Sequence, residues 1–354
     1  MVDNYAVLMP SMKIGGGNRV MLDFMDEAIK DNQNCKLFFL DRKGDSFDDI
    51  YSNSVSQTIF GDSVLSVVFF SIILSFRIRF DKSINFVIVS DPILSILSFI
   101  YSNKRRVRVV QANDFLLFEG NSKGGRFFNL IYQFFFKISQ KYQYSSVLFN
   151  SKYSLNTYKE TLTSAHLFST KHIINLSVFT LKCKKDIRLY PKPGSIKVCI
   201  VTNNHHRKGY KQFLEIVKNS KIKGINYMVI SQENLDSQLK NVTHVKPKSD
   251  DEYVAVLKQC HFILSTSTFE GFGLPLIEAM AIGIVPIAFY NPGMDEYNNE
   301  KNIAIISNTL DFDNIITNIV NNQDRYIKIS ESVIKSASVF TRQTFYFSIM
   351  NKIH

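Results

Sequence analysis

Two glutamates separated by seven residues, Glu270 and Glu278, flank a short segment that contains two glycines and a proline. An apolar strand-like run over 261–267 precedes this segment, and a helical pattern over 274–282 follows it. Pro275 suits a first helical turn, where no N–H donor is needed. Glycines let a backbone approach a ligand closely, and a helix start offers free amides and a positive dipole end to a phosphate. The segment therefore indicates a site for a phosphorylated molecule that carries several hydroxyl groups.

The wording EGFGLPLIEAMAIGIVPIA closely resembles the E-x7-E element of the retaining glycosyltransferases of family 4 (group 1) that build bacterial surface polysaccharides. The resemblance implies that Glu270 lies beside the donor hexose and that Glu278 holds the ribose hydroxyls of the nucleotide. It also implies that the backbone of Phe272, Gly273 and Leu274 faces the sugar and the phosphates. A plain strand–turn–helix unit, with a glutamate favoured by the helix dipole, is the alternative.

A glycine-rich turn lies near the N-terminus, where residues 10–19 read PSMKIGGGNR between a strand-like and a helical segment. Glycines at such a turn allow close approach to a diphosphate, although Val20 occupies the place of the third glycine of a GxGxxG pattern. Related enzymes carry a similar turn, so we expect Gly16 and Gly17 to contact the donor. A flexible loop, with Arg19 on a helix surface, is the alternative.

A basic turn, NNHHRKG, occupies residues 203–209, again between a strand and a helix. Lys208 and Arg207 are suited to neutralising a diphosphate leaving group, Arg207 in a bidentate manner. The resemblance places a lysine at Lys208 and an arginine at Asn203, so the chain departs from the family at Asn203. Arg207 is the candidate substitute for that arginine, and a solvated basic turn is the alternative.

Two shorter segments add further candidates. Asn113 and Asp114 end a strand expected over 106–114, where the resemblance places a histidine near the reacting sugar. Asp114 is suited to orient an acceptor hydroxyl or to act as a base, and equally to cap a following helix. Gly293 and Glu296 lie in a loop that borders the donor phosphates in the resembling family, and a simple turn is the alternative.

No metal or other cofactor is expected, with a nucleoside-diphosphate sugar as the donor substrate. The segment DFD (311–313) formally matches a metal-binding D-x-D motif, but it immediately precedes a helical pattern, where aspartates are ordinary caps. His205 and His206 have no carboxylate or cysteine pattern around them that would indicate a metal site.

The composition indicates anionic partners. The net charge is +11, and no zinc finger or RNP-type motif accompanies it, so phosphorylated substrates and anionic lipids are favoured over nucleic acid. Residues 125–144 mix bulky aromatics with basic residues, as in an interfacial helix on an anionic membrane; a buried core helix is the alternative. The apolar run over 64–76, followed by Arg77 and Arg79, is too short to span a bilayer. It fits the same two alternatives, an interfacial helix or a core helix, and a core helix is favoured.

The order of elements predicts an α/β protein with two domains. Strand-like and helical segments alternate in both halves of the chain, which is typical of parallel sheets covered on both faces. We expect a GT-B fold, in which two Rossmann-like doubly wound domains face a cleft. Its expected parts are an acceptor-side domain (1–182), a linker (183–195), a nucleotide-sugar-binding domain (196–335) and a helix that crosses back to the first domain (336–354).

The resemblance thus implies an enzyme that transfers a hexose, with retention, from a nucleoside-diphosphate sugar to a saccharide acceptor, such as a polyprenyl-linked one. Synthesis of O-antigen or capsule is the expected setting. Scattered cysteines and the lack of a secretory leader favour the cytoplasm, at the inner face of the cytoplasmic membrane. The alternatives are a nucleotide-sugar epimerase or phosphorylase of the same fold, and a basic nucleic-acid-binding protein.

Overall fold

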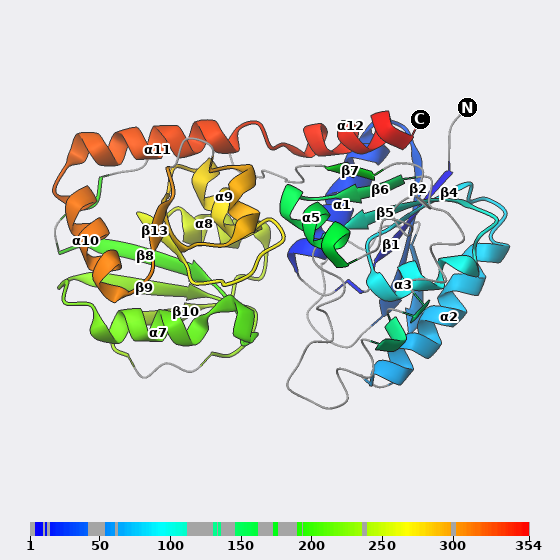
Figure 1. Cartoon of the computed structure of the whole chain (residues 1–354), viewed down its shortest axis with the longest axis horizontal. Helices are drawn as coiled ribbons and strands as arrows, with labels where there is room; N and C mark the ends of the chain where they lie inside the picture. Colours follow the sequence, from blue (N-terminus) through cyan, green and yellow to red (C-terminus); the bar gives the residue numbers. More distant parts are fainter. Residues whose placement is uncertain are drawn as a thin grey trace. The chain divides into compact units, whose positions relative to one another are not determined.

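The computed structural model describes residues 4–9, 11–12, 15–41, 54–60, 63–111, 130–132, 134–135, 146–161, 173–175, 190–192, 194–235, 239–298 and 302–353. The chain forms two compact units. Unit 1 comprises Met1–Thr180 together with Arg342–His354, and unit 2 comprises Leu181–Thr341. Each unit contains a parallel sheet with helices on both faces (Figure 1), as expected from the alternation of strands and helices.

The sheet of unit 1 has the order β3-β2-β1-β4-β5-β6-β7 among the described residues. Its inner strands are buried along nearly their whole length, because helices cover both faces, and they are accordingly rich in Val, Ile, Leu and Phe. The strands are β1 (Asn4–Met9), β2 (Asn34–Asp41), β3 (Ser54–Thr58), β4 (Phe86–Val89), β5 (Arg105–Val110), β6 (Ser146–Phe149) and β7 (Ile173–Asn175).

The helices of unit 1 lie on opposite faces of this sheet. Figure 1 shows α1 (Gly16–Lys30) and α12 (Arg342–Ile353) on one face, and α2 (Val64–Phe80) and α3 (Pro92–Ile96) on the other. Side chains cap two of these helices: Ser63 accepts a hydrogen bond from the Ser66 amide, and Asp91 accepts one from the Leu94 amide. The 3-10 helix η1 (Leu97–Phe99), helix α5 (Lys152–Thr161) and the helical residues 130–132 and 134–135 complete the described elements of the unit.

The sheet of unit 2 has the order β10-β9-β8-β11-β12-β13. The chain builds outward from β8 in one direction and from β11 in the other, so the topological switch point lies between these two strands. Ligands of open α/β sheets bind at such a point, outside the carboxyl ends of the strands. The strands are β8 (Ile196–Val201), β9 (Ile225–Ile230), β10 (Val242–Val245), β11 (Phe262–Ser265), β12 (Val285–Phe289) and β13 (Ala304–Ile306).

The helices of unit 2 also cover both faces of their sheet. Helix α7 (Tyr210–Asn219) packs with α10 (Thr309–Val320), and α9 (Leu274–Ala281) packs with α11 (Gln323–Ala337). Figure 1 shows α7 on one face and α8 (Asp250–Leu257) and α9 on the other. Two 3-10 helices, η3 (His206–Lys208) and η4 (Pro292–Glu296), follow β8 and β12.

The boundaries of the units differ slightly from those expected from the sequence. Helix α11 continues through Ala337, and unit 1 resumes at Arg342 rather than at residue 336. The described end of the expected linker belongs to unit 2, because the Tyr190 ring packs 5.7 Å from that of Tyr326 and its hydroxyl donates to the Val320 carbonyl. Within the described residues, no helix combines the length and hydrophobicity that crossing a bilayer requires.

Helix α12 is held to α1 by a buried ion pair, which gives a test of its place in unit 1. The Arg342 guanidinium lies 2.5 Å from the carboxylate of Asp23, which is 1% exposed. Arg342→Met leaves that carboxylate without its nearest partner, so we expect a loss of about 3 kcal/mol in the free energy of unfolding, measured by urea titration. The double variant with Asp23→Asn should recover part of the loss. The exposed Lys328→Met control should change stability by less than about 0.5 kcal/mol. A loss for Arg342→Met no larger than that of the control would contradict the assignment.

Candidate functional site

Two loops meet at the switch point of unit 2, because β8 and β11 are adjacent parallel strands. The first loop carries η3 and ends at Gly209, and the second runs from Thr266 to Gly273. Gly209 has a φ of +67°, and a Cβ at this position would lie 2.0 Å from the Thr266 carbonyl oxygen. Glycine is therefore required twice over, by its backbone conformation and by the close approach of the two loops.

Hydrogen bonds between the loops fix their register. The Thr266 hydroxyl donates to the Gly209 carbonyl at 2.8 Å, and the Thr268 amide donates to the Arg207 carbonyl at 3.0 Å. This register brings the Lys208 Nζ to 2.6 Å from the Glu270 Oε1. Both side chains remain partly accessible, at 28% and 17% exposure, so a ligand can reach them. The structure thus brings together two residues that the sequence singled out separately.

The first loop is electropositive beyond Lys208 itself. Burial, and then the positive charges of Arg207, His206 and Lys208, lower the pKa of His205 below its ordinary value. The Arg207 guanidinium lies 5.5 Å from the centre of the Phe269 ring, a cation–π distance. An anion is the ligand that such a turn favours.

Asn203, where the resembling family has an arginine, has a local structural role. Its Oδ1 accepts a hydrogen bond from the His205 amide at 3.0 Å and so shapes the start of the basic turn. Arg207 is the next arginine of this loop, and its position over Phe269 places it beside the second loop as well. Arg207 therefore gives this loop an arginine four residues after the position at which the resembling family has one.

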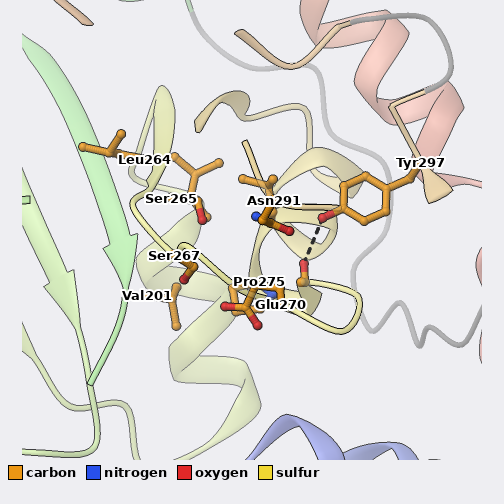
Figure 2. Close-up of a pocket in the computed structure, with 11 residues that line it drawn as sticks. Val201, Leu264, Ser265, Ser267, Glu270, Pro275, Asn291 and Tyr297 are labelled. Atoms are coloured by element: carbon orange, nitrogen blue, oxygen red, sulfur yellow. Dashed lines mark hydrogen bonds between the residues drawn. The ribbon is translucent and has the colours of Figure 1, made fainter. Parts of the chain in front are cut away.

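Helix α9 begins at a left-handed glycine. Gly273 has a φ of +87° and is the N-cap, with no side-chain cap for the first amides of the helix. The buried Tyr297 lies beneath this turn, and its hydroxyl donates to the Gly273 carbonyl at 3.4 Å (Figure 2). Burial, followed by the charges of Glu270 and Asp295, raises the pKa of Tyr297 well above its ordinary value, so the phenol keeps its proton. The uncapped helix start is suited to a phosphate.

The Phe272 side chain is committed to packing, so only its backbone is placed to face a ligand. Its side chain is 3% exposed and packs between the rings of Tyr297, at 5.3 Å, and Phe340, at 5.6 Å. Leu274 is the first residue of α9, so its amide is among those at the helix start. The side chains of this loop therefore anchor it in unit 2, while its backbone amides are the groups suited to a ligand.

Glu278 lies on α9 and is oriented by a neighbouring helix. The hydroxyl of Tyr253, on α8, donates to the Glu278 Oε2 at 2.7 Å. Tyr253 belongs to no motif that would have drawn attention to it in the sequence. The nearest indication is its place in the first turn after the Ser249 cap of α8.

A small pocket adjoins the Glu270 loop (Figure 2), with Ser265, Ser267, Glu270 and Asn291 among its lining residues. Asn291 is 2% exposed, and its Oδ1 has no hydrogen-bond partner in the described part of the chain. A buried orphan acceptor carries an energetic penalty, so Asn291 is a candidate ligand contact that the sequence did not reveal.

Gly293 packs against the loop that carries Glu270. A Cβ at Gly293 would lie 2.5 Å from the Glu270 carbonyl oxygen, so η4 can support the Glu270 loop only with glycine at this position. Glu296 is half-buried at the end of η4.

The glycine turn of unit 1 is exposed and is hydrogen-bonded to Gln111. Gly17 accepts a hydrogen bond from the Gln111 Nε2 at 3.0 Å, and a Cβ at Gly17 would meet the Gln111 side chain at 3.1 Å. Gly16 is the first residue of α1, and Arg19 lies 3.6 Å from Asp23 on the same helix. Asn113 and Asp114, which follow Gln111, lie outside the described residues.

The aspartates of the DFD segment have structural partners. Asp311 forms a capping box with Asn308 at the start of α10, and Asp313 accepts hydrogen bonds from the Ser220 hydroxyl and the Lys221 amide. Among the described residues, no group of three or more His, Cys, Asp or Glu side chains is arranged to hold a metal ion.

Comparisons with known proteins agree with this arrangement. Residues 184–336 match the family described as glycosyl transferases group 1. No curated protein matches the chain in sequence. Solved structures resemble it over their whole length. Sucrose-phosphate synthase from Thermosynechococcus elongatus has a TM-score of 0.73 at 12% identity, covering 99% of this chain and 98% of that one.

Two further solved structures are similar to the chain over nearly their whole length. HepE from Anabaena, solved in complex with UDP and glucose, has a TM-score of 0.70 at 17% identity and covers 99% of both chains. The lipopolysaccharide outer core galactosyltransferase WaaB has a TM-score of 0.61 at 16% identity, with 99% of this chain and 98% of that chain covered. At identities this low, the solved structures show only the fold of the chain. The chain therefore has the GT-B fold, and its residues 184–336 match the glycosyl transferases group 1 family.

Proposed function

We propose that the protein is a retaining hexosyltransferase of the family 4 type, which takes its sugar from a nucleoside-diphosphate donor. The observation that carries the proposal is the 2.6 Å pair of Lys208 and Glu270 beside the uncapped start of α9. A cation, a carboxylate and the start of a helix at one switch point suit a ligand that is anionic at one end and hydroxylated at the other. The Anabaena protein with this fold was solved with UDP-glucose, which supports a donor of this class.

In this proposal each group of the site has a distinct task. The diphosphate binds at the helix start and draws Lys208 away from Glu270, because a phosphate offers more negative charge than a carboxylate. Lys208, with Arg207 nearby, then stabilises the charge that builds on the departing diphosphate. Glu270 becomes free to accept hydrogen bonds from the hydroxyls of the hexose, and Glu278 holds those of the ribose.

Several finer points rest on the resemblance to family 4 enzymes and remain part of the proposal. Gly16, Gly17 and Gly293 are proposed donor contacts, and Asn113 and Asp114 are proposed to serve the acceptor. The acceptor is proposed to be a polyprenyl-linked saccharide, in the synthesis of O-antigen or capsule at the inner face of the cytoplasmic membrane. The lipopolysaccharide galactosyltransferase among the similar structures supports this setting.

A donor screen tests the proposal directly. Nucleotide release is measured from a panel of UDP-, GDP-, dTDP- and CDP-sugars, with and without polyprenyl-linked acceptors, and the anomeric configuration of the product is read by NMR. We expect one donor to give acceptor-dependent release and a product with the donor's configuration. An epimerised sugar, or sugar release that requires inorganic phosphate, would instead identify an epimerase or a phosphorylase. Tight RNA or DNA binding at moderate salt, without turnover of any donor, would favour the nucleic-acid-binding alternative.

Lys208 is predicted to be the main charge partner of the leaving group. Lys208→Ala should lower kcat by roughly two to three orders of magnitude, the scale of losing one electrostatic partner in the transition state. The exposed Lys211→Ala on α7 is the matched control and should keep near-parental kcat. If Arg207→Ala is impaired while Lys208→Ala is not, the two residues have been assigned the wrong roles.

The two glutamates are predicted to affect different kinetic constants. Glu278→Ala should raise the donor KM by about 10- to 100-fold, because hydrogen bonds to a charged group are lost. Tyr253→Phe, which removes the hydroxyl that orients Glu278, should raise the same KM by about three- to fivefold. Glu270→Ala should mainly lower kcat.

Steady-state kinetics over a range of donor concentrations separates these effects. Tyr326→Phe makes the same chemical change in the core of unit 2, where the hydroxyl donates to the His261 carbonyl, and should leave the donor KM unchanged. Equal kinetic constants for Glu270→Ala, Glu278→Ala and the parent would contradict both assignments.

Transfer is predicted to continue in excess EDTA. Lys208 and the helix amides supply positive charge to the diphosphate, while Asp311 and Asp313 are engaged in helix capping and loop hydrogen bonds. Initial rates should agree within about twofold with and without the chelator, since no charge partner is removed. Complete loss of activity that manganese restores would show that a metal takes part.

A further inference from the structure

Helix α2 of unit 1 buries one face and exposes an apolar stripe on the opposite face. The buried face is formed by Val67, Ser71, Leu74, Ser75 and Ile78. The opposite face carries four large apolar side chains, with exposures of 72%, 58%, 46% and 71% for Leu65, Phe69, Phe76 and Phe80. The sequence favoured a core helix over this run, and that expectation is wrong for the outer face.

The positions of the four residues follow the helical repeat. With 3.6 residues per turn, all four fall within about 60° of arc, directly opposite the buried face. Phe60 extends this surface before the helix begins. It is 80% exposed, but it is held in place by the bond from the Ser66 hydroxyl to its carbonyl and by its ring, 5.9 Å from that of Phe70. We call these five residues the α2 stripe: Phe60, Leu65, Phe69, Phe76 and Phe80.

Positive charge flanks the α2 stripe at its carboxyl end. Arg77 and Arg79 are exposed and lie on opposite sides of the stripe in the helical repeat, and the exposed Lys82 follows. Each guanidinium donates from one nitrogen to a backbone carbonyl, Arg77 to that of Ser56 and Arg79 to that of Ile100. The nearest carboxylate, Asp81, is paired with Lys36 at 2.6 Å. Residues 63–111 hold seven Lys and Arg against two Asp. Arg106 and Arg108 are buried, so five basic residues remain to make this part of unit 1 positive at the surface.

A neighbouring segment carries similar side chains. Residues 130–132 and 134–135 are helical, and Tyr132 and Phe135 pack in the same core cluster as Val67 of α2. Leu130 and Phe134 are 65% and 61% exposed. The remainder of the segment over 125–144, from which membrane contact was expected, lies outside the described residues. Phe135 is half-buried in that cluster, so replacing it would disturb folding as well as any surface contact.

We propose that the α2 stripe is the surface by which the protein docks on an anionic lipid membrane. Figure 1 shows α2 at the margin of unit 1, with α3 beside it. A helix with a polar-free outer stripe and flanking arginines lies in the plane of the interface, its aromatic rings at the level of the acyl boundary and its guanidinium groups among the phosphates. This inference rests on the proposed function to the extent that a lipid-linked acceptor requires an enzyme at the membrane.

A single tryptophan reports on the contact directly. The chain contains no Trp, so Phe76→Trp introduces one fluorophore into the α2 stripe. The matched control is Phe347→Trp on α12, where the phenylalanine is 50% exposed. With vesicles of phosphatidylglycerol and phosphatidylcholine, we expect a blue shift and quenching by bromine-labelled lipid for Phe76→Trp alone. Equal responses of the two variants would overturn the assignment of the surface.

Flotation with the same vesicles separates the apolar and the charged contributions. The variant carrying Phe69→Ser, Phe76→Ser and Phe80→Ser should bind the vesicles at least about tenfold more weakly than the parent at high salt, because interfacial burial survives screening. Phe347→Ser should bind like the parent. Binding of the parent should weaken without phosphatidylglycerol. Unchanged flotation of the triple variant would overturn the proposal. A parent that is dimeric in solution and a triple variant that is monomeric would also overturn it, because the α2 stripe would then be a dimer interface.

Turnover of a water-soluble acceptor distinguishes the two proposals. The triple variant should retain parental turnover with a soluble acceptor, because no residue of the α2 stripe belongs to the site of unit 2. If the triple variant keeps the parental turnover and also binds membranes as strongly as the parent, the docking surface is wrong and the proposed enzyme stands. Membrane binding through the α2 stripe in a protein that turns over no donor would instead contradict the proposed enzyme.

Discussion

The close approach of two loops at the switch point of unit 2 is the constraint on which the site depends. Gly209 and the Thr266 carbonyl leave no room for a Cβ between them, and hydrogen bonds from Thr266 and Thr268 set the register. Only in this register do Lys208 and Glu270 come within 2.6 Å of each other. The arrangement places a cation from one loop and a carboxylate from the other at one edge of a rigid sheet.

Other residues of the candidate site hold the loop that carries Glu270 in place. Tyr297 holds the left-handed turn at Gly273, and the Gly293 backbone supports the Glu270 loop. Phe272 anchors the same loop between two aromatic rings. Most of the side chains that the E-x7-E wording contains are thus committed to packing, so that a few groups are presented to a ligand: one lysine, two carboxylates and the amides at a helix start. In the proposed function, the ion pair of Lys208 and Glu270 keeps both charges satisfied until a diphosphate replaces the carboxylate.

The sequence predicted the elements of the candidate site where local patterns carried the information. Glycines, a proline and two glutamates between a strand and a helix were enough to locate α9 and its loop, and RKG was enough to locate η3. Three described strands escaped prediction, β3, β7 and β10, and all three are edges of their sheets. An edge strand is short and partly solvated, so SVSQT and VTHV show no apolar run. Tyr253, Asn291 and Tyr297 could not be found from local patterns, because their roles arise from contacts between separate elements. The exposed stripe of α2 was not located from the sequence, because a helix that is apolar on all sides is typical of a buried helix, and a core helix was therefore favoured.

Amide hydrogen exchange with bound nucleotides tests the central claim most directly. UDP, GDP, dTDP and CDP are added separately to the full chain, with the corresponding nucleosides as controls, and exchange is followed by mass spectrometry. One diphosphate should slow exchange both in peptides that cover residues 202–210 and in those that cover 268–278, whereas its nucleoside should leave residues 202–210 unchanged. Binding that protects neither peptide, or no binding by any of the four diphosphates, would contradict the account.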